Sequence, residues 1–248
     1  MLSENNAYRE LVKVITLQEF DPDLPDYIDE LYPHYEIKNT HIFPNQYFYI
    51  IRATDLKFIY VSPAVQRITG YTPEEFPNII FENIHSEEQD IIFKANCAAY
   101  KYGQALKVED IGVLSLQVNN RMKRKNGDYF HQLRLTTNIR SDRKGHLLFI
   151  LSVCTDISDI KFDNKVKIKI FTKDETLFSL SNDKFQERVD RLTNREKEIV
   201  KLLCQNLSSK LIANTLYISR HTVDTHRRNI LKKLEIADTR QIHFFQNI

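Results

Sequence analysis

The sequence predicts an α+β chain in which an N-terminal antiparallel sheet with short helices precedes an all-α domain of four helices. Between residues 47 and 158, runs rich in β-branched and aromatic residues are separated by turn dipeptides such as Asn126-Gly127. From residue 190 to residue 248, apolar residues instead recur at helical spacing, and each such run follows a residue that can cap a helix.

The composition is that of a globular chain with two ordinary domains: 248 residues, 42% hydrophobic and 27% charged. No apolar run approaches the roughly 18–20 residues that cross a bilayer, and residues 1–6 show no secretory signal. We therefore expect a cytoplasmic protein without a membrane partner. Cys97, Cys154 and Cys204 are far apart in apolar surroundings, which favours reduced structural thiols, with redox sensing as the alternative.

Charge is distributed unevenly along the chain. Residues 186–248 contain twelve Lys and Arg against seven Asp and Glu, or +5, whereas residues 1–185 contain twenty-three against twenty-six, or −3. The two parts sum to the net charge of +2. A basic C-terminal part on a slightly acidic body is typical of a protein that binds nucleic acid at one end.

Residues 1–46 are expected to form a helical cap, because two apolar sets at helical spacing occur there. The sets are Leu11, Val14, Ile15 and Leu17, and then Tyr27, Ile28 and Leu31.

Residues 47–158 predict one domain with strands at 47–53, 57–61, 114–123, 129–141 and 147–156. A helix through Ala64 should end at Gly70, another should start with Pro73 in its first turn, and a longer one should span 88–100. The strand at 147–153 is apolar on both faces, so one face needs a cover, either the N-terminal segment or a second subunit.

Residues 159–189 form the expected linker between the domains. Val166, Ile168 and Ile170 alternate with lysines, which is the periodicity of a strand. We expect a β-hairpin over residues 165–180 whose apolar face docks on another surface, because a lone hairpin is marginal in water.

In residues 190–248, Thr193 and Glu196 have the spacing of a capping box at the first helix. Ser208 and Ser219 can cap the second and third helices, and Asp238 and Thr239 a short fourth one. The motifs that follow are Leu192-Thr193-x-Arg195-Glu196-x-Glu198-Ile199, Ile212-Ala213-x-x-Leu216-x-Ile218-Ser219 and Thr222-Val223-x-x-His226. This ungapped series resembles the LuxR-type, also called NarL- or GerE-type, helix-turn-helix domain. Asn206 and Glu235 depart from the family, which usually has Gly there.

The resemblance implies double-stranded DNA as partner, with the third helix in the major groove and the fourth used for dimerisation. The base-facing positions are those of Asp224, Thr225 and Arg228; Arg228 could read guanine and Asp224 could accept from cytosine. Contacts to phosphate are expected from the remaining polar residues nearby, with a merely solvated helix face as the alternative. These residues are Lys210, Arg220, Thr222, Arg227 and Lys232. His226 lies one turn from Val223, so we expect it to be packed.

The N-terminal domain resembles the PAS family. The motifs that carry the resemblance are Ala53-Thr54-Asp55, Tyr60-Val61-Ser62-Pro63-Ala64, Thr69-Gly70-Tyr71-Thr72-Pro73-Glu74-Glu75, Lys125-Asn126-Gly127-Asp128-Tyr129 and Thr155-Asp156-Ile157-Ser158. The family implies sensing through an internal pocket, dimerisation, or both.

No cofactor is indicated, since Cys97 lacks the flavin-photoreceptor context and His85 is a lone histidine without a metal-ligand cluster. An apolar set could line a small-molecule cavity or equally fill a solid core. Its members are Phe93, Cys97, Tyr100, Leu116, Leu133, Leu135, Ile150 and Ser152.

Enzymatic motifs that join a nucleophile to a base, hold a metal or cradle a phosphate are not seen, so no enzyme activity is expected. The sequence therefore predicts a one-component, homodimeric transcription regulator whose PAS-like domain senses a ligand or partner and controls dimer geometry. The alternative is a regulator whose PAS-like domain is a ligand-free interaction and dimerisation module.

Overall fold

The structure is a computed structural model that describes residues 5–16, 19–27, 43–104, 114–160, 165–171, 176–181, 187–237 and 239–245. The chain divides into two compact units, Met1–Ser179 (unit 1) and Leu180–Ile248 (unit 2), and each is described by itself. The predicted Leu17, Ile28 and Leu31 positions and the Asp238 position lie outside the described residues.

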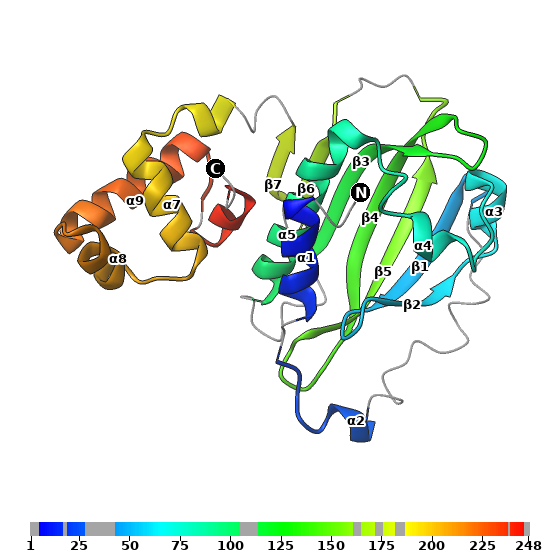
Figure 1. The fold of residues 1–248 in the computed structure, drawn as a ribbon, viewed down its shortest axis with the longest axis horizontal. Coiled ribbons are helices and arrows are strands. Elements are labelled where there is room, and N and C mark those ends of the chain that lie inside the picture. The colour runs from blue at the N-terminus through cyan, green and yellow to red at the C-terminus, as the bar shows by residue number, and fades with distance from the viewer. Residues whose placement is uncertain are drawn as a thin grey trace. The chain divides into compact units, whose positions relative to one another are not determined.

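Unit 1 is built on a seven-stranded sheet in the order β2-β1-β5-β4-β3-β6-β7 (Figure 1). The α+β class and the antiparallel sheet of residues 47–158 are as predicted, whereas the pairing of β3 with β6 was not predicted. The strands are β1 (Gln46–Arg52), β2 (Lys57–Val61), β3 (Ser115–Lys123), β4 (Tyr129–Ser141), β5 (Leu147–Asp156), β6 (Lys167–Phe171) and β7 (Thr176–Ser181).

Strands β6 and β7 extend the sheet beyond β3. In the antiparallel β3–β6 pair, Val118 lies opposite Ile168 and Leu116 lies opposite Ile170. Val166, Ile168 and Ile170 are each 1% exposed, so the alternating apolar face of this segment is part of the core of unit 1.

Three helices connect β2 to β3. α3 (Ala64–Thr69) ends at Gly70, whose φ of 82° is the left-handed conformation that glycine adopts readily. α4 (Phe76–Ile79) begins later than predicted, after a turn in which the backbone N–H of Thr72 and that of Glu75 each donate to the other's side chain, at 3.0 and 3.3 Å. α5 (Ser86–Gln104) is longer at both ends than the predicted 88–100.

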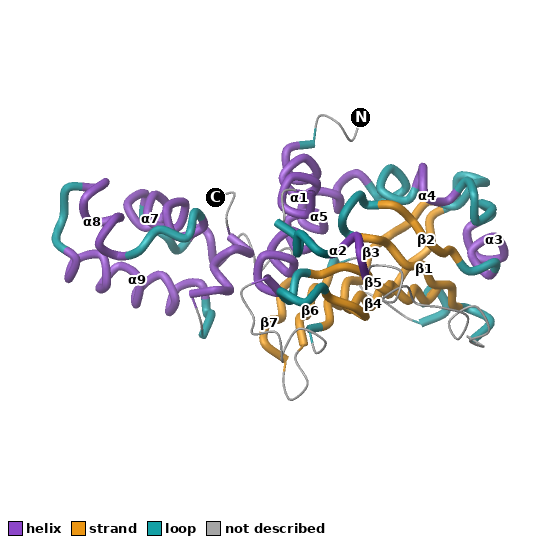
Figure 2. The backbone as a smooth tube through the Cα atoms, turned by 90° about the horizontal axis from the view of Figure 1, so that it is seen from below, coloured by secondary structure: helices purple, strands orange, loops and turns teal. Residues whose placement is uncertain are grey.

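The N-terminal segment packs on unit 1 in two places. α1 (Asn6–Thr16) lies beside α5, and both lie on one face of the sheet (Figures 1 and 2). Lys101 of α5 donates to Glu10 of α1 at 3.1 Å. After α1, Phe20 and Leu24, the latter in α2 (Leu24–Tyr27), pack against Phe149 and Leu151 of β5. The N-terminal segment therefore covers apolar residues of β5, which is one of the two covers that the sequence allowed.

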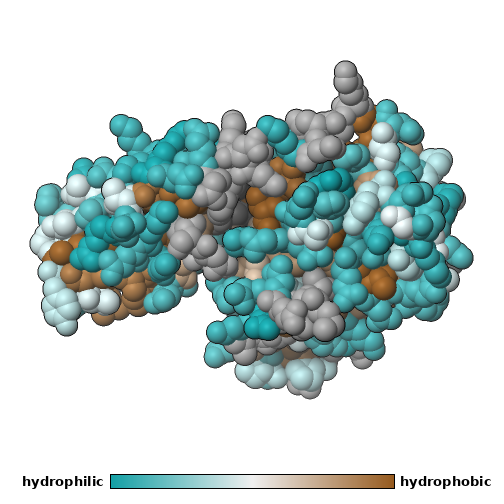
Figure 3. All heavy atoms as spheres, turned by 45° about the horizontal axis from the view of Figure 1, so that its top comes forward, coloured by the Kyte–Doolittle hydropathy of each residue, from teal (hydrophilic) through white to brown (hydrophobic). Residues whose placement is uncertain are grey.

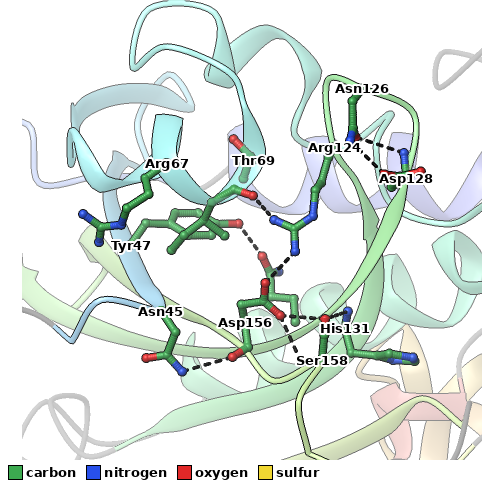
Figure 4. Close-up of polar contacts among 12 residues, drawn as sticks. Asn45, Tyr47, Arg67, Thr69, Arg124, Asn126, Asp128, His131, Asp156 and Ser158 are labelled. Atoms are coloured by element: carbon green, nitrogen blue, oxygen red, sulfur yellow. Dashed lines mark hydrogen bonds and ion pairs between the residues drawn. The ribbon is translucent and has the colours of Figure 1, made fainter.

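A polar network at the end of β5 joins three parts of unit 1 (Figure 4). Arg124, just after β3, pairs with Asp156 at 2.6 Å and also donates to the carbonyl of Ile68 in α3. Ser158 donates to Asp156 at 2.7 Å, and Asn45 donates to the Asp156 carbonyl at 3.1 Å. Burial raises the pKa of Asp156, but the bonds from Ser158 and Arg124 lower it further, so the net pKa lies below its ordinary value. The Thr155–Ser158 motif therefore ties the sheet to α3 and the β3–β4 turn.

Unit 2 consists of α7 (Asn194–Cys204), α8 (Ser209–Leu216), α9 (Arg220–Leu234) and a final 3₁₀ helix, η4 (Thr239–Phe245). Its three α-helices start at the predicted caps, Thr193, Ser208 and Ser219, whose hydroxyls each accept a backbone N–H three residues on. Asn206 and Glu235, the two departures from the family pattern, have φ of 60° and 52° and take the left-handed conformation without a glycine.

Hydrophilic side chains cover most of the face seen in Figure 3. Among the described helices, none combines the length and the apolar character that crossing a membrane requires.

Candidate nucleic-acid interface and internal cavity

One side of α9 carries a row of polar side chains four residues apart, which we call the α9 row: Arg220, Asp224, Arg228 and Lys232. Val223, Ile230 and Leu234 of the same helix are fully buried and lie on a different face of it. Because residues four apart lie on one face of an α-helix, the row points away from this buried stripe.

Among the described residues, the contacts of the α9 row are weak surface ones. Arg220 approaches Asp224 at 3.7 Å, with the two side chains 75% and 47% exposed. Arg228 donates to Thr225 at 3.3 Å. Exposed contacts of this kind contribute little to stability, so the side chains are available to a partner.

The other predicted contacts lie near the start of α8 and α9. Lys210 is exposed in the first turn of α8. The Thr222 hydroxyl lies 2.8 Å from that of Ser219 at the start of α9, and Thr225 donates to the His221 carbonyl at 3.0 Å. His226 is half-buried.

Arg227 differs from its neighbours because its guanidinium bonds within unit 2. It donates to Ser209 at 2.8 Å, at the start of α8, and to Thr239 at 3.3 Å, at the start of η4. The sequence grouped Arg227 with the expected phosphate contacts, since the tertiary partners of an arginine on a helix cannot be read from helical spacing. The geometry makes Arg227 a link between three helices.

Sequence reasoning missed the turn between α8 and α9. Tyr217 lies there with φ of 54° and is 95% exposed. Arg195 of α7 donates to the carbonyl of Leu216 at 2.9 Å and so supports this turn. The sequence pattern did not indicate an exposed Tyr217, because an aromatic residue between Leu216 and Ile218 does not mark a turn.

The first helix is fixed to α9 through a buried carboxylate. Glu196 is 3% exposed and accepts from the Thr193 backbone at 2.8 Å and from Lys233 of α9 at 2.7 Å. Burial alone would raise the pKa of Glu196, but Lys233 and Thr193 lower it more, so its net pKa lies below the ordinary value. These contacts fix the helix that carries the α9 row.

Unit 1 contains a cavity of about 130 Å³ among α1, α5 and the sheet. Its walls are mostly apolar, with Leu11 and Ile15 from α1 and Ile51 from β1 among them. Four of the predicted pocket residues line it: Tyr100, Leu116, Ile150 and Ser152. The structure therefore has a cavity in this region, where the sequence was compatible with either a cavity or a solid core.

The other four predicted pocket residues do not line this cavity. Phe93 and Cys97 are fully buried elsewhere in the core. Leu133 and Leu135 flank Arg134, which lines the cavity, so strand alternation turns both leucines to the opposite face, where Leu135 is 43% exposed.

The polar part of the cavity was not predicted. Arg134 is 8% exposed and donates to Asn96 of α5 at 2.8 Å, and Asn96 donates in turn to the Ile92 carbonyl at 2.8 Å. The hydroxyls of Thr136 and Ser152 lie 3.0 Å apart across β4 and β5. Binary patterning hid this site, because it treats a charged residue in a strand as facing solvent.

Cysteine chemistry does not add a reactive group here. Burial raises the pKa of the Cys154 thiol to about 12, which keeps it protonated and poorly nucleophilic. Within the described ranges, no three His, Cys, Asp or Glu side chains are grouped so that they could hold a metal ion.

Comparison with known families places both units. Residues 190–245 match the family described as bacterial regulatory proteins, luxR family. Residues 58–154 match the family described as PAS fold.

Similar proteins include the monoamine regulon transcriptional regulator of Klebsiella aerogenes, which is 30% identical over 124 residues, covering 48% of this chain and 55% of that protein. The uncharacterized response regulatory protein YgeK of Escherichia coli (strain K12) is 53% identical over 47 residues, which is 19% of this chain and 32% of that protein. The chain thus spans between about a third and about half the length of these relatives.

Among solved structures, the phage VqmA–DPO complex is 15% identical with a TM-score of 0.34, covering 88% of this chain and 87% of that one. The N-terminal domain of a diguanylate cyclase with PAS/PAC sensor from Marinobacter aquaeolei is 17% identical with a TM-score of 0.36, covering 46% and 95%. On the two family matches, this chain is a PAS domain followed by a luxR-family helix-turn-helix domain.

Proposed function

We propose that the chain is a one-component transcription regulator that binds double-stranded DNA through unit 2. The observation that carries the proposal is the α9 row, three cations and one carboxylate turned outward from the core of a luxR-family domain. Helices with such a face enter the major groove, where side chains reach the base edges.

Within this proposal the residues have different roles. Arg228 donates to guanine, and Asp224 and Thr225 contact neighbouring base edges. Lys210, Arg220, Thr222 and Lys232 contact phosphates, which position the protein without specifying sequence. Arg227 holds α9 against α8 and η4, because its donors are used within the domain.

Unit 1 is the sensory part in this proposal. Its cavity is a place for a small molecule, and occupancy would change the geometry of a homodimer that spans two half-sites. The alternative is a ligand-free dimerisation module, which the exposed Leu135 on the outer face of β4 favours. Both versions act on DNA in the cytoplasm.

The experiment is DNA binding by the full chain, measured by fluorescence anisotropy with a pool of random duplexes, because the preferred site is unidentified. We expect the logarithm of affinity to fall linearly with the logarithm of salt concentration, since bound cations displace counterions. Lys210→Ala should make the slope shallower by about 0.9.

Lys201→Ala is the matched control, because Lys201 is also exposed but lies on α7. It should leave the slope unchanged. An affinity that does not depend on salt, or equal effects of the two lysines, would contradict the proposed interface.

A further inference from the structure

The cavity of unit 1 contains a buried cation, the guanidinium of Arg134. Arg134 is 8% exposed, and no Asp or Glu occurs among the described residues that line the cavity. A guanidinium stays charged under all ordinary conditions. Burying such a charge without a counter-charge costs free energy, so the arrangement calls for an anion.

Donor geometry leads to the same requirement. The Arg134 Nη2 donates to Asn96, but its Nε is buried and has no hydrogen-bond partner within the described structure. Buried polar atoms are nearly always hydrogen-bonded, so the Arg134 Nε–H marks where a bound molecule would supply an acceptor.

We propose that this cavity binds a small monocarboxylate with an apolar body, held through Arg134. One buried cation balances one negative charge, and a dianion would leave a net charge in an apolar space. The inference rests on the sensory role proposed above and names the chemical class of the signal.

The size of the cavity limits the ligand. At about 130 Å³ it is close to cavities that hold a benzene-sized molecule. The carboxylate would lie at Arg134, and the body would contact Leu11, Leu116 and Ile150. Short branched-chain or single-ring carboxylates fit this description.

The test compares 3-methylbutanoate with its neutral amide and with 3-methylbutylamine, each titrated into the full chain by calorimetry. Hydrogen bonds to charged groups are about twice as strong as neutral ones, so the carboxylate should bind on the order of tenfold more tightly than the amide. The amine should bind least. In a ¹H–¹⁵N spectrum, the Arg134 Nε–H resonance should shift with the carboxylate.

Arg134→Met keeps an unbranched, apolar side chain without the charge and should abolish the preference for the carboxylate over the amide. Ile150→Val is the matched control, because it changes volume and leaves the cation, so the ratio of affinities should persist. If Arg134→Met does not fold, the comparison of the three ligands and the shift of the Arg134 Nε–H resonance, both measured on the wild-type chain, test the proposal. Equal binding of carboxylate and amide, or binding of neither at millimolar concentration, overturns the proposal.

The same samples separate this inference from the proposed function. Salt-dependent DNA binding without carboxylate binding would support the proposed DNA-binding function and contradict the proposed ligand class. Carboxylate binding without DNA affinity would support the ligand class and contradict the DNA-binding function. Carboxylate binding that leaves DNA affinity unchanged supports the ligand class and contradicts control by the cavity.

Discussion

Glu196→Gln should destabilise unit 2, because Glu196 closes the capping box of α7 and also binds α9. Its Oε2 accepts from the Thr193 backbone at 2.8 Å and from Lys233 at 2.7 Å, and the residue is 3% exposed. Glutamine preserves the shape and can still accept one hydrogen bond, but it removes the charge.

The expected loss follows from these contacts. A helix N-cap interaction contributes about 0.5–2 kcal/mol, and a hydrogen bond to a charged group about 1.5–3 kcal/mol. Glutamine retains part of the first, and the Lys233 side chain is 34% exposed, so solvent screens part of the second. We therefore expect a loss of about 1.5–2.5 kcal/mol in the free energy of unfolding of unit 2.

The pH dependence gives a second signature. The pKa of Glu196 is lower in the folded state than its ordinary value of 4.5, so its ionised form stabilises the fold. That contribution is present above the ordinary pKa and is lost as pH falls through the folded value. The difference between wild type and Glu196→Gln should therefore shrink below about pH 4.5.

Urea titrations followed by the amide resonances of Ile199, Val200 and Leu203 would report α7 alone. Lys233→Met serves as the partner variant, and the double variant should lose less than the sum of the single losses. If wild type and Glu196→Gln keep the same difference from pH 6 to pH 3, the charge of Glu196 does not hold α7 to α9.

Three further predictions concern other sites. Arg228→Ala should weaken binding to the preferred duplex by about 1–3 kcal/mol and relax its base preference while leaving the melting temperature nearly unchanged, as measured by anisotropy on the selected site and by calorimetry. Leu135→Glu, at an exposed residue, should turn dimers into monomers in sedimentation, and a persistent dimer would exclude this face of β4. Ile168→Lys should destabilise unit 1 by several kcal/mol, on the order of 3 or more, because it buries a charge opposite Val118. The Ile168→Lys substitution should not change the urea transition seen in the amide signals of α7. An unchanged stability of unit 1 would show that β6 is not part of its core.

Much of the fold could be predicted because local chemistry and tertiary structure agree. The alternation that includes Ile168 and Ile170 corresponds to β6, which begins just after Val166, and the capping box at Thr193 corresponds to the start of α7. What alternation could not supply was the partner of β6, since pairing with β3 joins residues about fifty positions apart. Sequence periodicity carries no information on such pairing.

The candidate sites were predicted unevenly for the same reason. The α9 row follows from helical spacing alone, so its residues were found. Arg227 and Arg134 have side chains that reach other elements, Ser209 and Asn96 respectively, and the reach of a side chain depends on tertiary packing. The late start of α4 was not predicted, because Thr72 and Glu75 form the reciprocal bonds of a capping box and Pro73 follows, which are both signals of an earlier start.

The extension of the sheet by β6 and β7 also determines where unit 1 can be truncated. Along β3, residues Ser115 to Asn119 are paired with β6, so their backbone groups are not an open edge. A fragment that ends near residue 158, where the family resemblance ends, would uncover that edge together with the apolar surface that Ile168 and Ile170 cover. Unpaired strands of this kind template association with other chains. An expression fragment that retains β7, ending after Ser181, keeps the edge protected and should remain dispersed where the shorter one aggregates.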